Sequence, residues 1–139
     1  MPEIVLPGGG SVQSVQSAIG AFLRNKVLEH MLRGQAYTPP STVYLSLHSS
    51  NPGTTGANEI SGGSYVRQAM ALNVAVGNII SNSGAVDFPV MPAAGVAALG
   101  IWDAESNGNF LWGGDTTVKT TNAGDTYEIP DASLTVSIT

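Results

Sequence analysis

Residues 96–112, VAALGIWDAESNGNFLW, decide the fold class of this 139-residue chain. Two apolar runs, 96–102 and 110–112, flank the dipeptide Asn107-Gly108. This dipeptide is the strongest short signal for a turn between antiparallel strands. The stretch therefore predicts a β-hairpin, and the segments around it extend the same pattern.

Short segments with the composition of strands follow one another from residue 42 to the C-terminus. Residues 42–48 and 133–138 alternate apolar and polar side chains with a period of two, as half-buried strands do. A loop rich in Asn, Pro, Gly and Thr separates the first strand from the rest. The other expected strands cover residues 65–76, 78–82, 85–88, 116–120 and 126–129. About eight short strands predict a mainly β fold, a β-sandwich or jelly roll.

One N-terminal helix is predicted before these strands, over about residues 15–33. Ser14 or Ser17 is expected to cap its start, and Gly34 is expected to end it. Its apolar positions recur at helical spacing on one face. They are Val15, Ile19, Phe22, Leu23, Val27 and Met31.

The segment before the helix, residues 1–13, has no regular pattern. Two prolines bracket a short apolar run, and a triple glycine follows as a hinge. The run contains Ile4, Val5 and Leu6. We expect an extended N-terminal arm over residues 1–13 and a single β-sandwich domain, with its N-terminal helix, over residues 14–139.

Charge is scarce and unevenly placed. Charged residues make up 11% of the chain, against about 25% in an average soluble domain. Three of the five basic residues fall within 24–33, whereas residues 34–139 carry two basic and eight acidic side chains, a net of −6. Nucleic-acid binding needs a strongly basic face, so no nucleic acid is expected as a partner. A surface so poor in charge is typical of one that partners cover, and a small secreted β-domain is the open alternative.

The sequence also limits the chemistry. Cysteine is absent, which excludes disulfides, thiolate zinc sites and cysteine nucleophiles. No stretch approaches the roughly 18 apolar residues of a membrane span. The N-terminus lacks the features of a secretory signal. We therefore expect a soluble protein that is made in the cytoplasm and has no membrane partner.

No group of residues stands out as catalytic or metal-binding. His30 and His48 have no serine on a G-x-S-x-G elbow to serve, and no spacing selects a pair of carboxylates. Residues 103–108 match the first half of a calcium loop, but position twelve is Gly114 instead of a carboxylate. We expect no catalytic residues, no cofactor, no metal and no enzyme activity. A hydrolase is the least supported alternative.

Aromatic side chains leave one alternative of another class open. Five of them could stack on sugar rings in a glycan-binding receptor module; they are Tyr44, Tyr65, Trp102, Trp112 and Tyr127. Two tryptophans on facing strands of one hairpin are more often core or interface residues. We take as interface candidates Ile4, Val5, Leu6, Arg24, Lys26, Trp102 and Trp112.

Several motifs together resemble a family of small structural proteins of tailed bacteriophages, often labelled tail fibre or virion proteins. They include TPPSTVYLSL at 38–47, NEISGGSYVRQ at 58–68, LGIWD at 99–103 and NAGDT at 122–126. The resemblance runs from about Val27 to the C-terminus. It implies a virion component without catalytic residues that is made in the host bacterial cytoplasm.

From these features we expect a capsid decoration, or cement, protein that bridges neighbouring capsomers through its N-terminal arm. Its partners would be the major capsid protein or other virion proteins, and further copies of itself. A homo-oligomer is expected, with a trimer favoured because it matches local three-fold positions of an icosahedral shell. A tail, baseplate or fibre component is the alternative within the same class.

Overall fold

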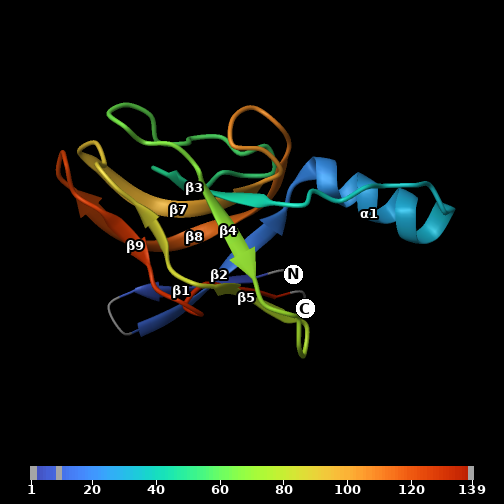
Figure 1. Ribbon diagram of the computed structural model, residues 1–139. Helices are drawn as coiled ribbons and strands as arrows, with labels where there is room; N and C mark the ends of the chain where they lie inside the picture. The colour runs from blue at the N-terminus through green and yellow to red at the C-terminus, as the bar shows by residue number, and fades with distance from the viewer. Residues whose placement is uncertain (1–2, 9–10, 138–139) are drawn as a thin grey trace.

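The computed structural model describes the backbone of residues 3–8 and 11–137 and the side chains of residues 19–137. The expected mainly β fold with one helix is confirmed (Figure 1). The elements are β1 (Glu3–Gly8), β2 (Ser11–Ile19), α1 (Ala21–Arg33), β3 (Val43–His48), β4 (Gln68–Leu72), β5 (Ile79–Ser83), β6 (Val86–Phe88), β7 (Ala94–Trp102), β8 (Phe110–Thr121), β9 (Tyr127–Ile129) and β10 (Thr135–Ser137).

Eight of the strands form one curled sheet that closes on itself. Its hydrogen-bonded order is β1-β10-β5-β4-β3-β7-β8-β2, and every neighbouring pair is antiparallel. Strands β6 and β9 form a second, two-stranded sheet. The walls of the curled sheet enclose the core as the two layers of a sandwich would, because each strand turns one face inward.

The core is built from alternate residues of the strands. Leu45 and Leu47 of β3 and Val96 of β7 are completely buried. Phe88 of β6 is almost as deeply buried, and its ring stacks on that of Tyr65 with the centroids 6.0 Å apart. The small sheet is therefore packed against the same core as the curled sheet.

The hairpin that the sequence predicts over residues 96–112 is present as β7 and β8. Its connecting loop covers residues 103–109, where Asn107 and Gly108 have positive φ angles of 55° and 74°. The backbone N–H of Asn109 donates to the carboxylate of Asp103 across the loop, at 2.6 Å. The carboxylate considered for calcium is thus used to close the hairpin. Strand β8 continues to Thr121 and includes the strand expected at 116–120.

The helix is shorter than expected, because it begins at Ala21 instead of near Val15. Residues 11–19 form β2, which pairs with β8, so Ser14 and Ser17 do not cap the helix. Gly20 occupies the N-cap position, so no side chain caps the start of the helix. The predicted end is confirmed, since Gly34 adopts a left-handed conformation with φ of 66°.

The N-terminal segment is extended, as expected, but it is not a free arm. Strand β1 pairs with β10 on one side and with β2 on the other, so residues 3–8 belong to the sheet of their own chain. Backbone pairing of this kind satisfies the N–H and C=O groups that a bridging arm would offer to a neighbour. Within the described residues, the segment that we expected to bridge capsomers is therefore paired with its own sheet, and the bridging role itself stays a prediction.

Candidate functional site: an apolar end of the sheet

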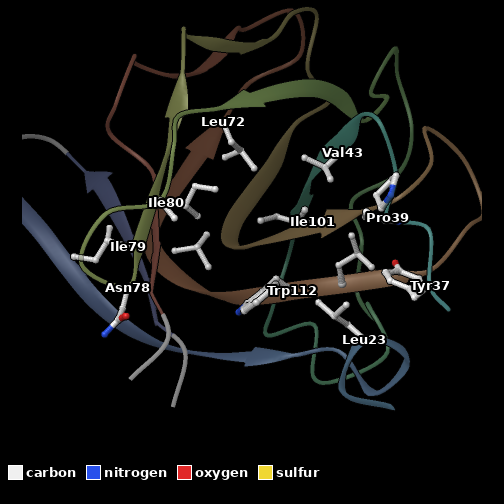
Figure 2. A pocket seen from close by; sticks show the side chains of 14 residues that line it. Leu23, Tyr37, Pro39, Val43, Leu72, Asn78, Ile79, Ile80, Ile101 and Trp112 are labelled. Carbon is white, nitrogen blue, oxygen red and sulfur yellow. The ribbon is translucent and has the colours of Figure 1, made fainter. Parts of the chain in front are cut away.

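An apolar cavity of about 540 Å³ opens at one end of the curled sheet (Figure 2). Its inner wall consists of inward-facing side chains from six strands, and its rim comes from the start of α1, the segment after it and the β4–β5 hairpin. The lining residues include Leu23, Tyr37, Pro39, Val43, Leu72, Ile79, Ile80, Ile101 and Trp112. The mouths of β-barrels are common binding sites, because inward-facing side chains leave space where the strands end.

Trp112 is the polar exception in this wall. Its ring is half-buried and lines the cavity. Its indole Nε1 is shielded from solvent, and it has no hydrogen-bond partner among the residues that the structure describes. A buried N–H without an acceptor costs free energy, so this wall is not optimised as a closed core.

The β4–β5 hairpin forms one rim of the cavity. Val76 and Ile79 exchange backbone hydrogen bonds of 2.9 and 3.2 Å. Gly77 and Asn78 between them both have positive φ angles, of 61° and 68°, as a type I′ turn requires. The hairpin presents apolar side chains to the surface, since Val74 and Val76 are 87% and 75% exposed.

Helix α1 starts at the opposite rim and projects away from the sheet (Figure 1). None of its residues is buried. Four large apolar side chains lie on one exposed side of it, at positions i, i+1, i+4 and i+5. These residues, Val27, Leu28, Met31 and Leu32, are named here the α1 stripe.

The other side of α1 is partly covered by its own chain. The ring of Phe22 lies edge-on to Tyr37, with the centroids 6.3 Å apart, and His30 Nδ1 lies 2.8 Å from the Gln35 carbonyl oxygen. The segment after the helix therefore runs back along this side, as Figure 1 also shows. The α1 stripe points elsewhere and is left without a partner in the described structure.

Exposed apolar side chains are concentrated at this end of the molecule. Of the ten large hydrophobic residues exposed in the described part of the chain, four form the α1 stripe and three belong to the β4–β5 hairpin. Clustered apolar exposure marks an interaction surface, whereas scattered single residues do not. The α1 stripe, the cavity and the hairpin residues Val74, Val76 and Ile79 are together named the apolar end.

The structure separates the interface candidates chosen from the sequence. Arg24 and Lys26 lie on the exposed surface of α1, and Trp112 lines the cavity, so these three belong to one end. Trp102 is only 9% exposed and is buried within its own chain, unlike the other three. The side chains of Ile4, Val5 and Leu6 lie outside the part of the chain for which side chains are described.

Trp102 instead takes part in a polar cluster with Arg67. The guanidinium carbon lies 3.6 Å from the Trp102 ring centroid. Arg67 donates to both carboxylate oxygens of Glu59, at 2.9 and 3.0 Å, and to the carbonyl oxygens of Ala104 and Asn107. One buried cation thus ties the β7–β8 loop to the segment that carries Glu59.

Two further aromatic residues considered for sugar stacking are also engaged inside the domain. Tyr65 is stacked on Phe88, and Tyr127 meets the same ring edge-on at 6.4 Å. Burial raises the pKa of Tyr65 and that of Tyr127. Each of these rings therefore packs against Phe88 inside the domain instead of being free for a sugar on both faces.

Ser46 and His48 form a hydrogen-bonded pair that the sequence did not suggest. Ser46 Oγ lies 2.7 Å from His48 Nε2, and both residues are completely buried. Because neither Ser46 nor His48 is exposed, this pair contributes to the packing of the interior. Within the described residues, no three His, Asp or Glu side chains are grouped to hold a metal ion. The one described helix is too short and too polar to cross a membrane.

The sequence prediction missed several residues of the apolar end. Leu28 and Leu32 were not placed on the predicted helical face, because that face was drawn through Val15 and Ile19. Val74 and Val76 could have been found from the sequence. They precede the Gly77-Asn78 turn, and turns are normally flanked by polar residues, so valines there indicate an exposed apolar surface.

Comparison with known protein families completes this description. The sequence profile of one family matches residues 18–137, and that family is described as Podophage GP4 fiber I protein gp80. No curated protein matches the chain. The match covers all elements from α1 to β10. This chain therefore belongs to the family of podophage GP4 fiber I protein gp80, a family of phage virion structural proteins of the fibre type.

Proposed function

We propose that this protein is a tail fibre component of the phage particle and works by burying its apolar end against neighbouring virion proteins. The observation that carries the proposal is the concentration of exposed apolar side chains on α1 and the β4–β5 hairpin. Burial of about 800 Å² per partner is typical of a stable interface. A projecting helix and a cavity rim together offer a surface of this kind.

The fibre assignment is favoured over capsid decoration for two reasons. The family is described as a fibre protein. The bridging arm on which the decoration hypothesis relied is paired into the sheet of its own chain. Capsid decoration is retained as the second candidate, because a charge-poor surface with one apolar end also suits a protein seated on a shell.

The proposed role is structural and not enzymatic. The buried position of Ser46 and His48 supports a packing role for that pair. The proposed partners are other virion proteins and further copies of this chain, with a trimer as the favoured assembly. Three-fold assembly would suit a fibre as well as a shell, because both are built from closed rotational symmetry.

Fractionation of particles tests this proposal. Complete particles of the parent phage are compared with DNA-filled heads that lack tails, and the protein is quantified in each by mass spectrometry. We expect it in complete particles and not in tailless heads. Equal amounts per head in both fractions would establish decoration instead, and absence from both would contradict a virion role.

A further inference from the structure

We propose that the apolar end is covered by a second copy of this chain, with the α1 stripe of one copy packed over the cavity mouth of the next. This inference rests on the proposed structural role and adds the partner and the surface. It joins two features that the fold places at one end of each molecule, an apolar ridge that the described residues leave exposed and an apolar cavity that opens at the sheet end.

The helix cannot cover the cavity of its own chain in this conformation. Leu23, in the first turn of α1, lines that cavity, whereas Leu32 is nine residues further along. At about 1.5 Å of rise per residue, this places Leu32 roughly 13 Å away along the helix axis. Contacts of Phe22 and His30 with the returning segment hold the helix in its outward direction. The stripe is therefore presented to another molecule.

The two surfaces match in size and character. The stripe carries Val, Leu, Met and Leu side chains in two adjacent i, i+4 pairs. The cavity of about 540 Å³ has an almost wholly apolar lining, and its volume lies within the range of pockets that bind apolar groups. Methionine suits such a contact, because its flexible side chain fills irregular space.

Charge favours a copy of the same chain as the occupant. Helix α1 carries three basic and one acidic side chain, a net of +2, whereas residues 34–139 carry a net of −6. The Arg67–Glu59 ion pair is neutral overall, so this negative net charge comes from the other side chains of those residues. A basic helix that approaches the body of another copy is therefore attracted to it.

The same charges disfavour a bundle made of α1 helices alone. Arg24 lies three, four and seven positions before Val27, Leu28 and Met31, which places it on the side of the stripe. Packing the stripes of several helices together would bring their Arg24 side chains together as well. Packing the α1 stripe of each copy over the cavity of another copy, an arrangement called here the helix exchange, avoids this repulsion. Such contacts can close into a symmetric dimer or ring.

Site-specific cross-linking tests the exchange directly, because the chain contains no cysteine. Met31→Cys and Ile79→Cys are made in separate chains, mixed in equal amounts and treated with a short bismaleimide. Separate chains ensure that any 31–79 link joins two molecules. Val118→Cys replaces Ile79→Cys in the control mixture, since Val118 is an exposed apolar residue of β8 away from the apolar end.

We expect a 31–79 dimer in several-fold excess over the 31–118 dimer. A 31–79 yield no greater than the control yield would overturn the proposal. Predominant 31–31 links would also overturn it, because they would indicate a helical bundle. The link is mapped by mass spectrometry of the digested dimer, so that these products are told apart.

Sedimentation gives an independent readout. Leu32→Asp is expected to weaken self-association at least about tenfold and leave a species near the 14.2 kDa monomer. Val118→Asp is the matched control and is expected to leave association unchanged. Both positions are exposed, so circular dichroism should show that both variants are folded. A wild-type protein that stays monomeric at high micromolar concentration would overturn the proposal.

Failure of this inference can be told from failure of the structural role. Wild-type protein that is present in particles but gives no 31–79 link would overturn the helix exchange alone. Protein that forms the link but is absent from particles would support the exchange and contradict the virion role.

Discussion

His48 is completely buried, and its hydrogen bonds fix its charge state. Its Nδ1 lies 2.7 Å from the carbonyl oxygen of Ala57, which only accepts, so Nδ1 carries the proton. Nε2 then accepts from the hydroxyl of Ser46, whose oxygen accepts from Trp102 Nε1. With His48 neutral, every donor and acceptor in this series of hydrogen bonds has a partner. A second proton on the ring would leave the Ser46 hydroxyl without its acceptor.

Burial lowers the pKa of His48 below its ordinary value of 6.5. The unfolded chain therefore binds a proton more readily than the folded one. His48 stabilises the fold fully above pH 6.5, and this contribution is lost as the pH falls below that value toward the lowered pKa. We expect the free energy of unfolding, measured with urea, to fall as the pH is lowered below the ordinary His pKa of 6.5. His48→Asn should flatten this dependence, and exposed His30→Asn should not; an unchanged slope in His48→Asn would refute the assignment.

Arg67 contributes to stability through its planar guanidinium. It makes a bidentate pair with Glu59, bonds two carbonyl oxygens and covers Trp102. Lysine keeps the charge but cannot make this set of contacts. We expect Arg67→Lys to lower the free energy of unfolding by about 2–4 kcal/mol, as measured by urea denaturation. Exposed Lys119→Arg is the control and should change it by less than about 0.5 kcal/mol; equal effects would show that the cluster adds little.

At the scale of elements, the junction between β2 and α1 depends on a glycine. The N–H of Gly20 donates to the Leu111 carbonyl oxygen at 2.7 Å, and Ala21 N–H donates to that of Thr54 at 3.0 Å. A Cβ at position 20 would collide with the carbonyl oxygen of Phe110, which is backbone and cannot move away freely. The φ angle of Gly20 is −60°, so space and not backbone strain excludes a side chain there.

We therefore expect Gly20→Ala to lower the free energy of unfolding by about 2 kcal/mol or more, since the backbone at the β2–α1 junction must shift to make room for the methyl group. Gly95→Ala in β7 is the matched control, because no atom lies within 4 Å of a Cβ built there. It should be neutral within about 0.5 kcal/mol. Chemical denaturation of both variants makes the comparison, and similar losses in the two would contradict the steric explanation.

The sequence predicted the elements whose signals are local. Asn107-Gly108 marked the β7–β8 hairpin, and Gly34 marked the end of α1. The start of α1 was wrong, because Val15 and Ile19 are four residues apart, a spacing that fits both a helical face and one side of a strand. Pairing of β2 with β8, some ninety residues away, decided between the two, and no local pattern reports such a pairing.

The apolar end was predicted only in part, and for a related reason. An apolar stripe on a helix ordinarily faces the core of its own domain, so the helical spacing of Val27 and Met31 gives no sign of their exposure. Their exposure follows from the outward direction of α1, which depends on the junction at Gly20 and on contacts of the returning segment. Trp112, which was singled out from the sequence, lines the cavity, and its interface role stays a prediction. Trp102 is buried beside Arg67, which lies thirty-five residues earlier in the chain.

At the scale of the whole molecule, the closed order of the main sheet limits how this protein can pair with others through its strands. A closed sheet leaves no free strand edge for pairing with another protein. Strand-to-strand contact through the main sheet is therefore not expected, and among the described strands only the β6–β9 pair has open edges. The apolar end, with its projecting helix, cavity and hairpin tip, is the surface that we propose for contact with neighbouring virion proteins.

Methionine oxidation measures the burial of this surface in the particle itself. Met31 in the α1 stripe is 69% exposed in the single chain, whereas Met70 and Met91 are at most 4% exposed and serve as internal references. Exposed methionine is converted by dilute hydrogen peroxide to the sulfoxide, which mass spectrometry locates. We expect rapid oxidation of Met31 in the monomeric Leu32→Asp variant and strong protection of Met31 in intact particles, close to that of the two references. Oxidation of Met31 in particles as fast as in the monomer would contradict burial of the apolar end.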